Sequence, residues 1–196
     1  MITVIQKSYK NLTLNQKEIL RYMGVKTVDP ETQKLVNECV AEFCDNAVYR
    51  VCYTEIPVEQ LNDGLNLGGF KVISKDLVIS LKGCKRVVIF AATVGIGVDR
   101  LINKYTRISP ARAVVLDAVG SEGIEALCNC FCDELKVNFG ALRPRFSAGY
   151  GDLPIEVQAE IFLLLQCGKN IGLTLNDSYI MSPSKSVTAF VGILND

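Results

Sequence analysis

The sequence contains no histidine, and none of its eight cysteines forms a Cys-x-x-Cys pair. The absence of histidine excludes every mechanism that depends on an imidazole: a Ser-His or Cys-His nucleophile, a histidine-ligated zinc ion or a histidine proton shuttle. Any chemistry that this chain supports must therefore depend on binding and positioning, or on groups other than imidazole.

The chain also lacks net charge, because Lys+Arg and Asp+Glu both number 21. No long-range attraction for nucleic acid or for an anionic membrane is expected from such a balance. No uninterrupted apolar run is long enough to span a bilayer, and the apolar part of the N-terminus is too short for a signal peptide. The sequence thus predicts a cytoplasmic protein that binds neither nucleic acid nor membrane.

The only cysteine cluster is Cys128-Asn129-Cys130-Phe131-Cys132. On a helix, Cys128 and Cys132 share a face while Cys130 points elsewhere. Free cysteines commonly serve as small buried apolar residues, so this reading is favoured and no metal site is predicted. An iron–sulfur or other metal site remains the alternative. The unpaired cysteines favour a reducing compartment.

With 196 residues and 49% hydrophobic residues, the chain suits one domain with a substantial core. Apolar spacing, caps and turn residues predict the elements of the first half. We expect a short strand or arm in 1–13, a helix from a capping box at Asn15 and Glu18 to Gly24, a helix from Asp29-Pro30 to about Ala47, a strand over 48–53, a turn-rich connection over 61–70, a helix over 75–82 and a strand over 86–92.

The segment Thr93-Val94-Gly95-Ile96-Gly97 joins that last strand to a helix-like stretch at 98–102. Strand, Gly-x-Gly turn and helix is the layout of a nucleotide-binding turn. The third glycine of that fingerprint is missing, since position 100 is Arg, and no acidic ribose partner follows at the usual distance. We therefore predict a tight strand-to-helix turn at this point.

Ser109-Pro110 predicts the start of a long helix that runs to about Val137. Gly120 and Gly123 should bend or interrupt it, or let another element approach closely. Glu125 lies beside the apolar stripe of this helix, where its carboxylate either faces a groove or is simply solvated.

The densest cluster of special residues is Arg145-Phe146-Ser147-Ala148-Gly149-Tyr150-Gly151-Asp152-Leu153-Pro154. Glycines allow main-chain groups to approach a ligand, arginine offers a planar fork to a carboxylate, and tyrosine offers a ring face and a hydroxyl. Asp152 is predicted to cap a helix over 154–166 with Pro154 in its first turn. The cluster is either a ligand-facing loop or an ordinary tight connection.

Beyond this helix we expect an extended segment from Leu173, a turn over 182–185 and a strand over 187–191. The two extended pieces are predicted to pair as a hairpin.

Three of these segments resemble the activation (reactivation) domain of cobalamin-dependent methionine synthase, in particular the short stand-alone proteins of that family. The stretch 145–150 is similar to the family's Arg-Pro-x-Pro-Gly-Tyr signature, with Phe146 and Ala148 in place of the prolines. Residues 178–187 resemble its Ser-x-x-Met-x-Pro-x-x-Ser-Val segment, with Ser182 where the family has tryptophan. The helix around Glu125 lies upstream, where the family carries an acidic ligand residue.

The resemblance implies an α+β fold: a bent, mostly antiparallel sheet flanked by helices, as in the methionine synthase activation domain. It divides the chain into an N-terminal helical and strand region, 1–85, and a core that binds S-adenosylmethionine, 86–196; the alternative is one continuous domain over 1–196. It also implies a role in which oxidised, inactive cob(II)alamin on a partner protein is reduced by one electron and trapped by methylation from S-adenosylmethionine.

By this analogy Arg145 pairs with the methionine carboxylate, and Glu125 accepts from the amino group or attracts the positive end of the ligand. Backbone groups of Ser147 and Gly149 bond the ligand, and Tyr150 lies near the methyl-transfer region. The resemblance implies no catalytic acid or base and no metal ligand in this chain.

The partner implied is a corrinoid-binding methionine synthase or methyltransferase subunit, with a flavoprotein or ferredoxin as electron donor. Two other functions remain open from the sequence. One is a non-catalytic subunit that docks on a corrinoid protein without binding S-adenosylmethionine, and the other is a cysteine-based metal or redox protein.

Overall fold

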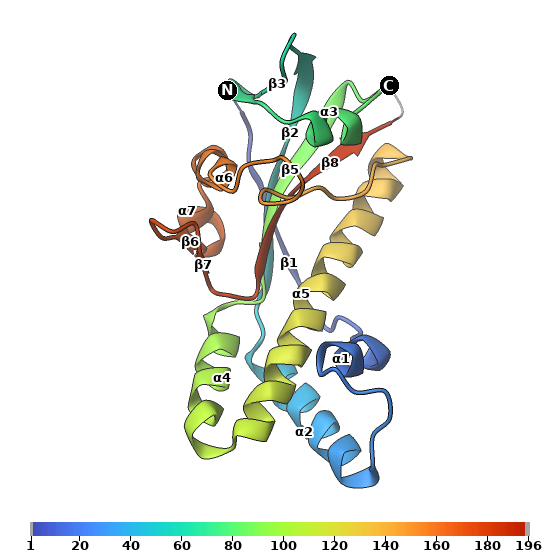
Figure 1. Ribbon diagram of the computed structural model, residues 1–196, viewed down its shortest axis with the longest axis vertical. Coiled ribbons are helices and arrows are strands. Elements are labelled where there is room, and N and C mark those ends of the chain that lie inside the picture. The colour runs from blue at the N-terminus through green and yellow to red at the C-terminus, as the bar shows by residue number, and fades with distance from the viewer. Residues whose placement is uncertain (1, 195–196) are drawn as a thin grey trace.

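The centre of the molecule is an antiparallel sheet whose longest members are β2 (Tyr49–Gln60), β5 (Arg86–Thr93) and β8 (Ser186–Ile193) (Figure 1). The computed structural model describes residues 2–194. The sheet has the order β4-β3-β2-β5-β8, and β1 (Ile5–Tyr9) pairs with the first half of β2. Two short strands, β3 (Leu65–Leu67) and β4 (Phe70–Val72), complete its other end.

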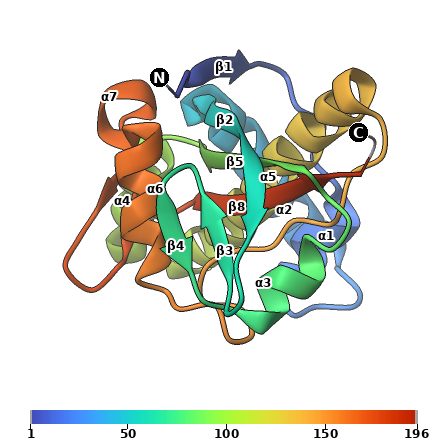
Figure 2. The same cartoon turned by 90° about the horizontal axis from the view of Figure 1, so that it is seen from above.

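Helices cover both faces of this sheet (Figures 1 and 2). The helices of one face are α1 (Gln16–Tyr22), α2 (Pro30–Asn46), α4 (Ile96–Ile108) and α5 (Pro110–Phe139). Those of the other face are α3 (Lys75–Ser80), α6 (Val157–Leu165) and α7 (Cys167–Ile171). The expectation of an α+β fold with a mostly antiparallel sheet flanked by helices is confirmed.

Strand β5 separates two hydrophobic cores. Val88, Phe90 and Ala92 are buried on the side of α5, and the alternate residues Val87 and Ile89 are buried on the side of α6. Successive side chains of a strand point to opposite faces, so a strand covered on both faces must be apolar throughout. This accounts for the continuous apolar run that the sequence shows over 86–92.

Helix α5 is the longest element and reaches from the helices at one end of the molecule to the sheet at the other (Figure 1). It is continuous from Pro110 to Phe139, so Gly120 and Gly123 do not interrupt it. Their lack of a side chain instead admits neighbours: a Cβ on Gly123 would overlap the buried ring of Phe43, and one on Gly120 would lie 3.1 Å from Cγ of Lys185.

The Gly-x-Gly turn before α4 has a structural explanation. Gly95 caps α4 with φ +87°, a conformation that L side chains rarely adopt. A Cβ on Gly97 would lie 2.5 Å from the carbonyl oxygen of Asn46, so this glycine lets the end of α2 approach closely. The structure thus shows the tight strand-to-helix turn that the sequence predicts.

Three sequence expectations are wrong in detail. The extended pieces near the C-terminus do not pair with each other: β6 (Thr174–Leu175) pairs with β7 (Met181–Ser182), whereas β8 pairs with β5. The predicted capping box is absent, because the backbone N–H of Asn15 donates to Glu122 of α5 and not to Glu18. Asp152 does not cap α6, which begins only at Val157 and has no side-chain cap. In each case a partner distant in sequence displaces a local one.

The segment between α5 and α6 runs along the outer edge of β8. Phe146 and Phe190 exchange two backbone hydrogen bonds of 3.0 and 2.8 Å, and the N–H of Arg143 donates to the carbonyl of Gly192 at 2.8 Å. In an extended segment adjacent side chains point to opposite sides. Phe146 accordingly packs into the core on the α6 side, while Arg145 points toward α5.

Candidate functional site

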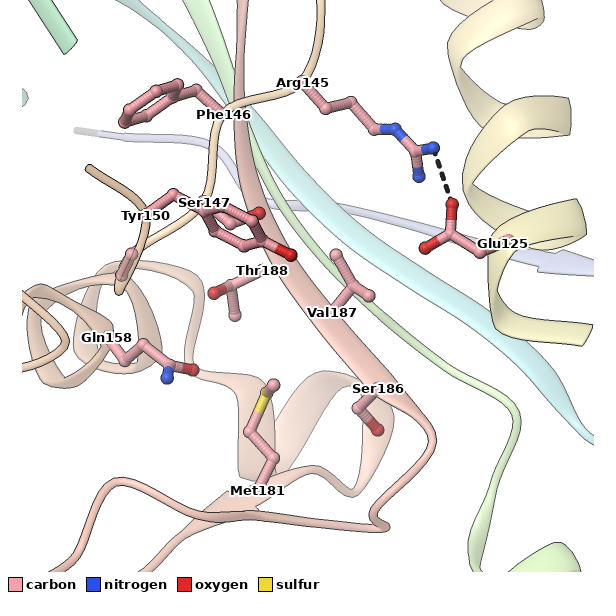
Figure 3. A pocket seen from close by; sticks show the side chains of 11 residues that line it. Glu125, Arg145, Phe146, Ser147, Tyr150, Gln158, Met181, Ser186, Val187 and Thr188 are labelled. Atoms are coloured by element: carbon pink, nitrogen blue, oxygen red, sulfur yellow. Dashed lines mark hydrogen bonds and ion pairs between the residues drawn. The ribbon is translucent and has the colours of Figure 1, made fainter. Parts of the chain in front are cut away.

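A cavity of about 480 Å³ opens between this edge segment, α5, α6 and β8 (Figure 3). Its wall combines charged, polar and apolar groups from these four parts of the chain and from β7. The lining residues are Glu125, Arg145, Phe146, Ser147, Ala148, Tyr150, Gln158, Met181, Ser186, Val187 and Thr188.

The charged part of the wall is an ion pair between Arg145 and Glu125. Nη2 of Arg145 lies 2.9 Å from Oε2 of Glu125 and also donates to Oδ1 of Asn129 at 3.0 Å. The side chains of Arg145 and Glu125 are 25% and 38% exposed, so both groups remain accessible from the cavity. A guanidinium beside a carboxylate presents both charges at one place, which suits a zwitterion such as an α-amino acid.

A compact turn holds the glycine-rich loop beside this pair. The N–H of Gly149 donates to the carbonyl of Leu153 at 2.9 Å, and the N–H of Leu153 donates to Tyr150 at 3.0 Å. Gly149 and Gly151 have φ values of +86° and +56°, so the loop depends on glycine at both positions. Leu153 is buried beneath it, which anchors the turn on the α6 core.

Asp152 ties the same loop to α3. Its carboxylate accepts from the N–H groups of Lys75 and Asp76, at 2.8 and 3.2 Å, and from the hydroxyl of Ser74. Asp76 in turn accepts from the N–H of Asp152 at 3.1 Å. The hydrogen bond from Ser74, followed by those from the backbone, lowers the pKa of Asp152. The loop that carries Tyr150 is therefore fixed by a helix cap made across the structure.

Four of the five predicted ligand residues line the cavity: Glu125, Arg145, Ser147 and Tyr150. Gly149 is not part of the lining, and its N–H is already bonded within the loop. Tyr150 is 69% exposed and lies at the mouth of the site. The structure thus brings the carboxylate of Glu125, 20 residues upstream, to the loop that carries Arg145 and Tyr150, whereas Gly149 contributes to the shape of that loop.

Sequence reasoning assigned no ligand role to Gln158, Met181, Ser186 or Thr188. Met181 and Ser186 belong to the 178–187 segment that carries the second resemblance, so a signal for them was present. The sequence also offered a sign for Gln158, because it is a polar residue at helical spacing, three positions before Ile161, on the buried face of α6. Thr188 is buried among the buried residues of β8 and gives no comparable sign.

The cysteine cluster contributes apolar volume next to the site. Cys128 is fully buried, and this burial raises the pKa of its thiol to about 12. Within residues 2–194 no group of three or more Cys, Asp or Glu side chains is arranged to hold a metal ion. Across the same range no helix is both long and apolar enough to cross a membrane.

Fold and cavity together define a class: an α+β protein whose cavity carries an arginine–glutamate ion pair. Its described residues offer charge pairing, hydrogen bonding and shape. No histidine can supply acid–base catalysis.

Comparison with known proteins gives the fold a reference. No family model matches the sequence, and neither does any curated protein. Among solved structures the chain is similar to the MetH reactivation domain bound to AdoHcy (S-adenosylhomocysteine), with a TM-score of 0.77 and 14% sequence identity. The similarity covers 100% of this chain and 79% of that one. The chain therefore has the fold of a methionine synthase reactivation domain, as the sequence resemblance implied.

Proposed function

We propose that this chain binds S-adenosylmethionine in the cavity and presents its methyl group to a corrinoid cofactor carried by a partner protein. The partner is a methionine synthase or a related methyltransferase, and the role is to return an inactivated cobalamin to its methylated form. A flavoprotein or ferredoxin would supply the electron.

The observation that carries the proposal is the ion pair of Arg145 and Glu125 within the cavity. Arg145 would bond the carboxylate of the methionine moiety, and Glu125 its ammonium group. The likeness in fold to a domain crystallised with AdoHcy supports the same class of ligand, and the cavity volume of about 480 Å³ lies in the range of small-molecule sites.

The remaining lining residues fit a task of positioning. A methyl group on a sulfonium is already activated, so its transfer needs orientation and no general acid or base. The exposed ring of Tyr150 offers a π-face to a cation and lies where a partner could approach the site. The turn around Gly149 and the cap by Asp152 keep that ring in place.

Isothermal titration calorimetry with AdoHcy and S-adenosylmethionine tests the binding step. We expect wild-type protein to bind both, and Arg145→Ala to weaken binding by about 10- to 100-fold, because a hydrogen bond to a charged group is worth about 1.5–3 kcal/mol. Arg107→Ala is the matched control: this arginine is exposed in the last turn of α4 and does not line the cavity. Absence of binding by the wild-type protein would overturn the proposal.

The partner step has its own test. A corrinoid methyltransferase in its oxidised state is mixed with reductant, S-adenosylmethionine and this chain, and return of the methylated corrinoid is followed by visible absorption. The proposal expects the return to require the chain and to fail with Arg145→Ala. If the chain binds a corrinoid protein but binds neither S-adenosylmethionine nor AdoHcy, it is instead a non-catalytic interaction subunit.

A further inference from the structure

One residue that lines the cavity carries a polar atom that the fold leaves without a partner. Gln158 is 5% exposed, and its Oε1 is buried with no hydrogen bond. Among residues 2–194 only two other side-chain atoms share this condition, Oη of Tyr49 and Nε of Arg143, and neither belongs to a residue of the cavity. Buried polar atoms in native proteins nearly always have a partner, so an exception on a cavity wall points to a ligand.

The amide nitrogen of Gln158 has one long hydrogen bond within the chain. Nε2 of Gln158 donates to the carbonyl of Tyr179 at 3.5 Å. Tyr179 belongs to a turn in which Oδ1 of Asn176 accepts from the N–H groups of Ser178 and Ile180, at 3.0 and 2.9 Å. Rotation of the amide would place two acceptor oxygens against each other. The unpaired atom is therefore an acceptor, and a ligand that reaches it can pair with it only through a donor.

Gln158 and the ion pair occupy opposite sides of the site. Figure 3 shows Glu125 and Arg145 on one side and Gln158 on the other, with Tyr150 and Thr188 between them. An amino-acid moiety at the ion pair would leave the nucleoside part of the ligand to extend toward α6. That part carries donors of two kinds, the 6-amino group of adenine and the ribose hydroxyls.

We propose that Oε1 of Gln158 accepts a hydrogen bond from a donor on the nucleoside part of the bound ligand and thereby determines which nucleosides the site accepts. This inference rests on the proposed function, because it takes the ligand to be an adenosyl amino acid. It adds a specificity residue outside the segments that carry the family resemblance.

The ligand side is tested on unmodified protein, so no variant has to fold. Affinities of AdoHcy, S-inosylhomocysteine and the 2′-deoxy and 3′-deoxy analogues of AdoHcy are measured by calorimetry. S-inosylhomocysteine replaces the amino donor by a carbonyl, and each deoxy analogue removes one hydroxyl. One analogue is expected to bind about tenfold or more weakly than AdoHcy, because a buried acceptor is left unpaired. Which analogue it is identifies the donor. Equal affinity for all four overturns the inference.

The protein side uses two substitutions of similar size. Gln158→Met removes the acceptor and is expected to weaken AdoHcy about tenfold while abolishing the preference over the discriminating analogue. Gln158→Glu keeps an acceptor oxygen but sets its other oxygen against the carbonyl of Tyr179, so it is expected to weaken AdoHcy while keeping that preference. Gln60→Met, at the exposed end of β2, is the control and should leave both affinity and preference unchanged.

The results separate the two proposals. Binding of AdoHcy by wild-type protein with an unchanged preference in Gln158→Met overturns the role of Gln158 and leaves the proposed function intact. No binding of AdoHcy by wild-type protein overturns both. If Gln158→Met weakens AdoHcy and the discriminating analogue equally, this result also counts against the inference, because it indicates only that the turn at 176–180 is disturbed.

Discussion

At the scale of single residues, Glu125 pairs with Arg145 and also competes with a ligand carboxylate for the guanidinium. Glu125 accepts from the guanidinium that would bind the carboxylate of the ligand. A zwitterion can satisfy both groups, whereas a simple carboxylate has to compete with Glu125. If the proposed function holds, we expect the pair to favour a ligand that retains its α-amino group.

Glu125→Gln tests this preference. We expect the substitution to weaken AdoHcy about tenfold, near the low end for a charged hydrogen bond because the side chain is 38% exposed. An analogue without the α-amino group should bind the variant as well as or better than it binds the wild type, since Arg145 is released. Calorimetry with both ligands measures the effect. Equal weakening of the two ligands would contradict the assignment of Glu125 to the ammonium.

Glu122 is a second carboxylate of α5, and it is nearly buried. Its Oε1 accepts from the N–H of Asn15 at 2.9 Å and so holds the start of α1 against α5. Burial raises the pKa of Glu122 above its ordinary 4.5, and the negative charges of Glu18 and Glu125 raise it further. The folded state therefore binds a proton more tightly than the unfolded state does.

This shift has a direction that can be checked. As pH rises through the window from 4.5 to the raised pKa, the folded state must give up a proton that the unfolded state has already lost, so stability falls. We expect Glu122→Gln to raise the melting temperature at pH 7 and to lose this advantage below pH 4.5, where the carboxyl is protonated in both states. Thermal unfolding between pH 3 and 8 measures it. Glu31→Gln, at an exposed position of α2, should show no such gain.

At the scale of elements, carboxylates join helices to loops from elsewhere in the chain. Asp152 lies in the loop before α6 but caps α3, and Asp99 of α4 accepts from the N–H of Ser184 in the turn before β8, at 2.8 Å. Such hydrogen bonds link the position of one element to that of another. Both loops that border the cavity, around Tyr150 and around Met181, are held in this way.

The two glycines of α5 provide a matched pair of substitutions. Alanine favours a helix interior over glycine by about 1 kcal/mol at either position. Gly123→Ala would force a methyl group into the ring of Phe43, which is fully buried, so we expect a net loss of about 1–3 kcal/mol. Gly120→Ala meets only the side chain of Lys185, and a change below about 1 kcal/mol is expected. Urea unfolding compares the two. Similar losses in both variants would contradict this account of close packing.

At the scale of the whole molecule, both halves of the chain build one sheet. β2, from the first half, forms its longest antiparallel ladder with β5, in which Arg50 through Pro57 pair with Thr93 through Arg86. Both cores draw side chains from before and after residue 85. A boundary at that position would expose an edge of β5 and the apolar residues on either side of it.

The division into 1–85 and 86–196 can be tested by expression of the second part alone. We expect the fragment 86–196 to lack a cooperative unfolding transition and to aggregate, because β5 loses β2, the strand that pairs with one of its edges. Circular dichroism and size-exclusion chromatography of the fragment and the full chain measure this. A monomeric fragment with a sharp transition would show that the two-part division is correct.

The sequence by itself determined those features that depend on neighbouring residues. The caps at Asn15 and Asp29, the doubly covered strand over 86–92 and the strand-to-helix turn at Gly95 all follow from local backbone preferences and short-range apolar spacing. The family signatures also placed Arg145 and Tyr150 on a loop near an acidic helix, and both residues line the cavity with Glu125.

Only the tertiary structure decided which distant groups meet. The pairing of β8 with β5, the cap that Asp152 makes on α3 and the bond from Asn15 to Glu122 each replaced a local partner by a remote one. That Oε1 of Gln158 lacks a hydrogen-bond partner also follows only from the tertiary structure, which places all of its neighbours. The physical reason is that a polar group or strand edge pairs with whatever folding brings to it, and sequence spacing specifies neither that partner nor, for Gln158, its absence.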